Sequence, residues 1–241
     1  GGKKVSEADL RPLFLQRLQQ LLRKSSNGLY TLSVADIKVD VLASRISLHN
    51  VAVQPDEGNR ASLQATGLLP ASVFNISFQR LELEGVNLDD ALTSKTMDYK
   101  LVRLVNPVIR IDRLQTKKNK EEAFTQRFLK ELEKLSIKRL VIEGGKIVVT
   151  DKQKGSTKSL ANVQVLMHDI LLDSTTRNDK SRFLFAKEAR IGFRNYHTTT
   201  KDGLYQFKIG DADVLATQKR VVLKNLSFTP TLSKKAFAEK Q

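Results

Sequence analysis

The sequence predicts a mainly β protein of the α+β type: an elongated, curved antiparallel sheet of repeated hairpins, with an N-terminal amphipathic helix and one inserted helix. From Leu29 onward, apolar and polar residues alternate over most of the chain, which is typical of half-buried strands. Two segments instead carry apolar residues at helical spacing. One line of sequence also occurs twice, near the two ends of the chain, which favours repeated units.

Residues 1–28 are expected to hold the first helix, after a Gly1-Gly2 pair that resembles the remnant of a removed tag. Ser6-Glu7-Ala8-Asp9 resembles a capping box, and Ser25-Ser26-Asn27-Gly28 would end the helix. Its arginines lie mostly off the apolar stripe, so it would either cover the sheet or lie on a membrane surface. The apolar stripe consists of Leu10, Leu13, Phe14, Leu18, Leu21 and Leu22.

Residues 29–232 are expected to form the β domain, followed by a basic tail at 233–241. Turns are expected at Pro55–Asn59, where Pro, Asp, Gly and Asn cluster, and at Asp89-Asp90, which would close a hairpin. A hairpin turn is also expected at Gly144-Gly145-Lys146. The alternation predicts a strand pair around Pro107 at residues 102–111, and strands near residues 29–41, 46–53, 74–88, 137–142, 146–150, 163–172, 183–193, 205–209 and 221–228.

A second helix is expected at residues 119–135, inserted between two groups of strands, with Asn119 as its cap. Acidic and basic residues interleave along it, which suits exposed helical pairs. Its apolar face would consist of Ala123, Phe124, Phe128, Leu132 and Leu135.

The repeated line is Asp-Val-Leu-Ala, then Arg-x-x-Leu-x-Asn, then an apolar alternation that ends at a proline. It runs from Asp40 to Pro55 and again from Asp213 to Pro230, where Gln218 and Lys219 are extra. A shorter echo relates residues 80–85 to residues 139–144, and both copies end in glycine. Because glycine inside a strand commonly marks a bulge or bend, the predicted unit is a strand, a kink or turn, and a strand.

Composition limits the classes of function. The chain has 41 Lys and Arg against 26 Asp and Glu, a formal net charge of +15, which favours polyanionic partners. It has no cysteine, so disulfides, thiolate metal sites and cysteine nucleophiles are excluded. No run approaches the ~18 consecutive apolar residues of a membrane-spanning helix.

No motif for catalysis or metal binding emerges. His49, His168 and His197 are far apart in sequence and have no partner at metal-ligand spacing, so they are interpreted as surface residues. Gly144-Gly145-Lys146 lacks the spacing of a phosphate-binding loop. No cofactor, no metal and no enzymatic activity are therefore expected. The basic residues are spread along the chain without interleaved stacking aromatics, which argues against nucleic acid as a partner.

The patterns at residues 37–55 and Phe78–Asp112 resemble the start of AsmA-like proteins, relatives of TamB in the bacterial envelope. The resemblance extends over about Leu29 to Asp151. It implies a membrane helix before a long sheet of hairpins curved into a groove, and a role in lipid transfer or outer-membrane assembly. It implies no catalytic residue. A periplasmic location follows, with an inner-membrane anchor that is absent from this sequence.

The sequence therefore predicts a non-enzymatic envelope protein whose apolar groove binds or transfers lipid, with phospholipid or an anionic membrane surface as partner. An envelope protein is a further candidate partner, and the oligomeric state is left open. The alternative is a scaffold or adhesion module that binds protein or polysaccharide and no lipid. The candidate groove residues are Ile76, Phe78, Leu81, Leu83, Ile142 and Phe228.

Overall fold

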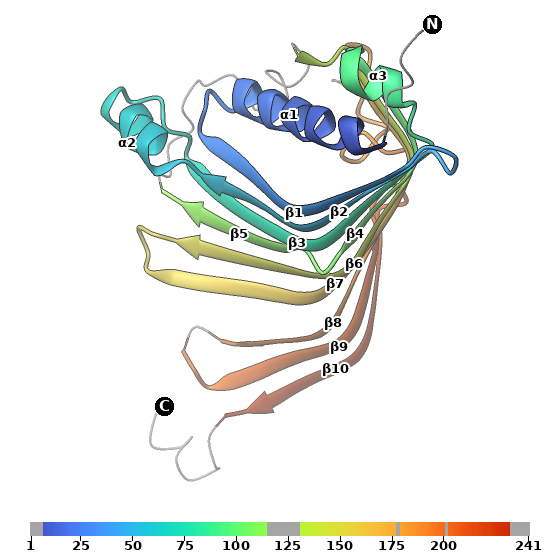
Figure 1. Cartoon of the computed structure of the whole chain (residues 1–241). Helices are drawn as coiled ribbons and strands as arrows, with labels where there is room; N and C mark the ends of the chain where they lie inside the picture. Colours follow the sequence, from blue (N-terminus) through green and yellow to red (C-terminus); the bar gives the residue numbers. More distant parts are fainter. Residues whose placement is uncertain (1–6, 115–130, 177–178, 201, 232–241) are drawn as a thin grey trace, which may run out of the picture.

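The computed structural model describes residues 7–114, 131–176, 179–200 and 202–231. It confirms a mainly β fold, with ten strands in one sheet. The elements are α1 (Glu7–Ser25), β1 (Tyr30–Asp40), β2 (Arg45–Pro55), α2 (Glu57–Ala65), β3 (Ser72–Glu84), α3 (Leu88–Thr93), β4 (Thr96–Val105), β5 (Val108–Arg113), β6 (Lys134–Asp151), β7 (Ser156–Leu172), β8 (Glu188–Thr199), β9 (Tyr205–Leu215) and β10 (Arg220–Pro230). Figure 1 shows a long bent sheet with α1 lying inside the bend.

The strand order along the sheet is β1-β2-β3-β4-β6-β7-β8-β9-β10, and β5 pairs with β3 and β6. Most neighbours are antiparallel, as expected, but β4 and β5 both run parallel to β6, so the sheet is mixed. Both also pair antiparallel with β3, so β4 and β5 behave as one strand interrupted at Asn106 and Pro107. Because Pro107 lacks an N–H group, it interrupts the ladder at this point.

The bend follows a line of residues whose backbone is left-handed. These residues have φ between +47° and +66°, a conformation that Asn and Gly adopt more readily than other residues. Asn50 faces Gln79 between two register pairs, and the Nδ2 group of Asn106 donates to Oε1 of Gln79 at 2.9 Å. The line consists of Asn50, Asn106, Gly144, Asn162, Asn195 and Asn225.

Each bend shifts the phase of the alternation by one residue. Leu48 and Val51 on β2 are 1% and 3% exposed although they lie three positions apart, because Asn50 between them rotates the chain. The apolar side chains therefore stay on one face of the sheet on both sides of the bend. We call the face against which α1 packs the inner face.

The repeated line of sequence is a repeated hairpin. It forms β1–β2 at one end of the sheet and β9–β10 at the other. In both copies a residue with positive φ, Ser44 or Lys219, precedes the arginine that begins the second strand, and Asn50 or Asn225 bends that strand. In the shorter echo both glycines have positive φ, but Gly85 follows the end of β3 whereas Gly144 lies inside β6.

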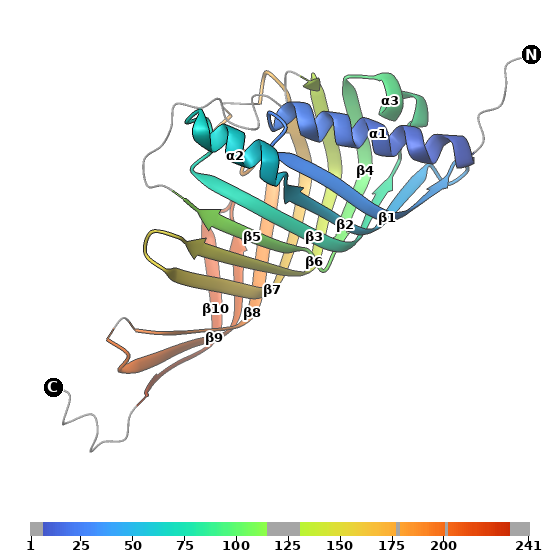
Figure 2. The same ribbon diagram turned by 60° about the vertical axis from the view of Figure 1, so that its left-hand side comes forward.

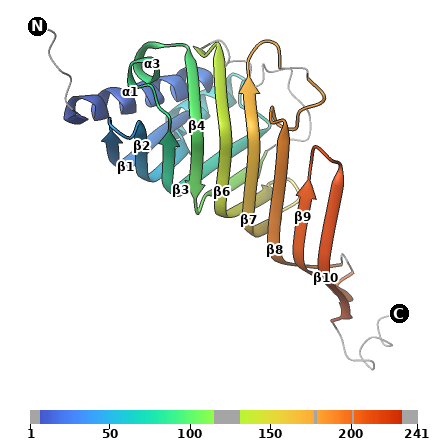
Figure 3. The ribbon, with the colours of Figure 1, turned by 90° about the vertical axis from the view of Figure 1, so that its right-hand side faces the viewer.

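The main core lies between α1 and the inner face of the first strands. Phe14 on α1 is 2% exposed and packs in one cluster with Ile46 and Leu48 on β2, whereas the adjacent Leu13 is 47% exposed. Figure 2 shows α1 along the β1 end of the sheet, with β8–β10 extending away from it. Figure 3 shows the bent arms of the strands side by side from β1 to β10.

Several local predictions were wrong. The turn expected at Pro55–Asn59 instead begins helix α2, because the Asp56 carboxylate accepts a hydrogen bond from the Asn59 N–H group at 2.8 Å and caps it. Asp89-Asp90 belongs to helix α3 and closes no hairpin. Gly144 and Gly145 lie within one long strand, β6, where the pairing with β7 is irregular.

Two further boundaries differ from the predictions. The strand expected from Phe183 begins only at Glu188, after an isolated bridge between Phe183 and Ala186. The helix predicted at 119–135 falls mostly outside the described residues. Its predicted end is wrong, because β6 begins at Lys134 and pairs with the start of β4.

Candidate functional site

One row of aliphatic side chains crosses nine strands on the inner face. Its members are residues that the register places opposite one another from strand to strand. We call this set the aliphatic row, and with neighbouring strands about 4.8 Å apart it extends over roughly 38 Å. The row consists of Ile37, Leu48, Leu81, Leu104, Ile142, Val165, Ile191, Val214 and Val221.

The core that includes α1 covers only the first part of the aliphatic row. At its first strands, Ile37 and Leu48 are 7% and 1% exposed and belong to the core that includes α1. At its last strand, Val221 is 59% exposed. Ile191, Val214 and Val221 are in neither of the two core clusters of the described chain. The aliphatic row is therefore part of the core at one end and exposed at the other.

The uncovered end is a patch on β8, β9 and β10 whose most exposed apolar side chains are on β10, whereas Ile209 and Ala212 on β9 are 8% and 2% exposed. Four rungs of the ladder bring one inner-face residue from each strand together, and eleven of the twelve side chains are apolar or aromatic. We call this patch the open apolar face. Its rungs are Ile191–Val214–Val221, Phe193–Ala212–Leu223, Tyr196–Ile209–Leu226 and Thr198–Phe207–Phe228.

Aromatic contacts order the open apolar face. Phe193 and Tyr196 meet edge to face with ring centroids 6.0 Å apart. Tyr205 stacks on Phe228 with centroids 4.6 Å apart, although Phe228 is still 59% exposed. Leu223 and Leu226 are 42% and 53% exposed. Large apolar side chains exposed together in this way mark interaction surfaces more often than single exposed ones do.

The six predicted groove residues all lie on the inner face, but not in one place. Leu81 and Ile142 are members of the aliphatic row, and Ile76 pairs with Ile109 on the other side of the bend. Leu83 is 5% exposed and part of the core, against which Phe78 and Leu81 also pack. Phe228 alone among the six lies on the open apolar face. Contact of these residues with lipid stays a prediction.

Sequence reasoning missed most of the open apolar face, including Ile191, Val214, Leu223 and Leu226. The alternation from Arg220 to Pro230 did show an apolar strand face there. It could not show that this face is uncovered, because that depends on how far along the sheet α1 reaches.

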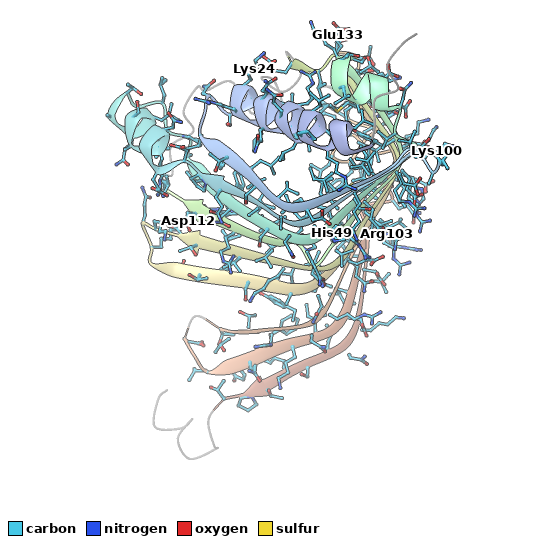
Figure 4. All side chains as sticks on the ribbon, viewed as in Figure 1. Lys24, His49, Lys100, Arg103, Asp112 and Glu133 are labelled. Carbon is cyan, nitrogen blue, oxygen red and sulfur yellow. The ribbon has the colours of Figure 1, made fainter. Side chains whose placement is uncertain are left out.

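The outer face carries paired charges. The guanidinium of Arg190 donates to both carboxylate oxygens of Asp213, at 3.1 and 3.0 Å. Glu82 lies between Arg80 at 3.0 Å and Arg103 at 3.4 Å, and Arg103 also reaches Glu143 at 3.1 Å. Figure 4 shows His49 and Arg103 near the bend of the sheet.

Of these charged residues, Arg190, Asp213 and Glu143 line a polar depression of about 730 Å³ across β6–β10. The hydrogen bond from Arg190 is the main reason why the pKa of Asp213 lies below its ordinary value. A carboxylate held ionised in this way has no proton to donate near neutral pH, so it is poorly suited to act as a general acid. The depression fits a structural network better than a catalytic pair.

The histidines are separated in space as well as in sequence. His49 is paired in register with Arg80, His168 with Arg139, and His197 with Lys208. Among the described residues, no group of three or more His, Cys, Asp or Glu side chains is placed to hold a metal ion.

Within the described ranges, none of the helices combines the length and apolar character needed to cross a membrane. No protein-family model matches the chain, and no curated protein shows significant sequence similarity to it.

Proposed function

We propose that this chain is a non-enzymatic lipid-binding module of the cell envelope that holds acyl chains on the open apolar face. The carrying observation is the aliphatic row, which runs without interruption from the core under α1 to the exposed side chains of β10. A periplasmic location with an inner-membrane anchor, and kinship with AsmA-like proteins, belong to the same proposal and stem from the sequence resemblance.

The dimensions support an acyl chain as ligand. From Val165 on β7 to Val221 on β10 the aliphatic row crosses three strand spacings, or about 14 Å. That is close to half of the ~30 Å hydrocarbon core of a bilayer, the depth of one leaflet. One acyl chain lying across β7–β10 would therefore find apolar side chains along most of its length.

The net charge supports an anionic headgroup. The chain carries +15, and charge of this sign attracts anionic lipid surfaces. Exposed Lys152, Lys154 and Lys158 lie at the β6–β7 hairpin, where these two strands end. A headgroup at the strand ends would leave the acyl chains free to lie on the inner face.

The test is equilibrium binding of an anionic phospholipid that carries one fluorescent acyl chain. Leu223→Asp and Phe228→Asp place a charge on the open apolar face and should each weaken binding about tenfold or more, a loss of ~1.4 kcal/mol. Ser227→Asp places the same charge on the outer face of β10 and is the matched control. Circular dichroism checks that all three variants fold.

The proposal fails if the unmodified chain does not bind this lipid, or if Ser227→Asp weakens binding as much as the inner-face variants. Such a result would favour the alternative, a scaffold that binds protein and no lipid. One observation specifically supports that alternative, namely that β10 pairs with β9 alone among the described strands.

A further inference from the structure

β10 is an edge strand of the sheet that the described residues form. β10 pairs with β9 on one side, and no other described strand pairs with it. The Thr231 N–H group donates to the Leu204 carbonyl at 2.8 Å, and antiparallel pairing alternates bonded and non-bonded positions. The N–H and C=O groups of Leu226 and Phe228 therefore point away from β9, where a further strand would meet them.

The two edge strands of the described sheet differ in how much they are covered. At the β1 edge, α1 packs against β1, and the Gln19 side-chain amide donates to the Leu32 carbonyl at 3.2 Å. At the β10 edge, Val221, Leu223, Leu226 and Phe228 are between 42% and 59% exposed. None of these four inner-face side chains carries a charge, and an edge strand that is long and apolar is prone to pair with another strand.

The inner-face residues of β10 are arranged symmetrically. Because Asn225 shifts the alternation, Val221, Leu223, Leu226 and Phe228 are spaced evenly about the peptide bond between Lys224 and Asn225. When a second β10 is laid antiparallel to the first, Val221 therefore faces Phe228 of the second copy, and Leu223 faces Leu226 of the second copy. All four apolar side chains on each strand find apolar partners on the same face.

The outer face permits the same register. Arg220 then faces Thr229 of the second copy, and Val222 faces Ser227 of the second copy, so no two like charges lie directly opposite. The nearest like charges are the two Lys224 side chains. Each lies opposite Asp211 on its own β9, a carboxylate that also pairs with Arg194 at 3.4 Å.

We propose that two copies of this chain associate through antiparallel pairing of their β10 strands about a two-fold axis between Lys224 and Asn225. The contact is isologous, as in most two-fold dimers, and it closes on itself. The pairing joins the two open apolar faces into one continuous surface of six strands. It depends on the edge of β10 and not on the proposed lipid ligand.

The chain has no cysteine, so single cysteines give a clean test of this register. Directly opposite residues in an antiparallel pair lie about 4.5–5.5 Å apart, within disulfide reach. Leu223 and Leu226 of the second copy are opposite, whereas two copies of Leu223, or of Leu226, are about 11 Å apart. Under mild oxidation, a mixture of Leu223→Cys and Leu226→Cys should form covalent dimers, and neither variant alone should do so.

The matched control mixes Val221→Cys with Leu226→Cys, which this register places about 8 Å apart, too far for a disulfide. Native mass spectrometry of the unmodified chain without lipid should show a dimer. The proposal is overturned if the unmodified chain is monomeric and the Leu223→Cys and Leu226→Cys mixture stays uncoupled. It is also overturned if the control mixture couples instead. Cross-linking is measured without lipid, so this result and the lipid-binding result are independent.

Discussion

Gly210 on β9 and Asn225 on β10 face each other where the two strands bend. They lie between the register pairs Ile209–Leu226 and Asp211–Lys224. A Cβ atom on Gly210 would lie 2.7 Å from the Cβ atom of Asn225, closer than two carbon atoms can approach. Because the atom in the way belongs to the base of the Asn225 side chain, it cannot move aside without the backbone. The bend of the last hairpin thus requires a residue without a side chain at Gly210.

Gly210→Ala should therefore lower the free energy of unfolding by roughly 1–3 kcal/mol, the usual cost of overpacking. Urea denaturation measures it. Gly58→Ala in α2 is the control, because the added methyl group would meet only an Asp56 side-chain oxygen, at 3.4 Å. That variant should be neutral or slightly stabilising, since alanine is more favourable than glycine inside a helix. Equal losses for the two variants would show that the bend does not depend on Gly210.

Asn50 tests the left-handed line at the opposite end of the sheet. Its φ is +47°, and its side chain is exposed. Asn50→Val should destabilise the protein by roughly 1–2 kcal/mol, because a β-branched residue disfavours this conformation. Asn50→Gly should stay within about 0.5 kcal/mol of the parent, since glycine adopts positive φ readily. Thermal unfolding of both variants measures the difference. Equal effects would show that the positive φ of Asn50 does not determine its contribution to stability.

The sequence predicted the strands better than it predicted their continuity. The break in the alternation near Asn50 was visible, because apolar residues stand three apart there. Gly144-Gly145 was wrongly predicted as a hairpin turn, since paired glycines are typical of two-residue turns. In the structure β6 continues through both glycines, because it pairs with β4 before them and with β5 after them. Such long-range pairing leaves no local signal.

The candidate site was less predictable than the fold. Each member of the aliphatic row could be recognised as an inward-facing strand residue, but its neighbours depend on a register that spans the whole chain. The choice of Leu83 as a groove residue shows the difficulty. Leu83 follows the same alternation as Val221, yet one is core and the other is open surface, because Leu83 lies on an interior strand near the core and Val221 lies on an edge strand.

The contact between α1 and the inner face can be tested on the helix itself. Phe14→Ala should lower the free energy of unfolding by about 3–5 kcal/mol, because the 2% exposed ring leaves a cavity against the sheet. Leu13→Ala, next to it but 47% exposed, should change stability by no more than about 0.5–1 kcal/mol. Chemical denaturation compares the two. Similar losses would mean that α1 does not pack through the Phe14 side.

Tyr99 on β4 makes stability depend on alkaline pH. Burial raises its pKa to about 12 from the ordinary value of 10.0, and its hydroxyl donates to the sulfur of Met97, at 3.4 Å. Because the raised pKa belongs to the folded state, the stabilisation is fully present below pH 10 and is lost as the pH rises from 10 to 12. The loss should be on the order of 2 kcal/mol at the upper end of this range.

Unfolding by urea at a series of pH values, compared with Tyr99→Phe, isolates this contribution. All other ionisable groups are common to the two proteins. Among them Tyr30 also has a raised pKa, mainly through burial, which the hydrogen bond from the Phe74 N–H group partly offsets. The difference between the two proteins should be small near neutral pH and should turn against the parent chain above pH 10, since phenylalanine cannot ionise. A difference that stays constant across the alkaline range would show that the Tyr99 ring is open to water.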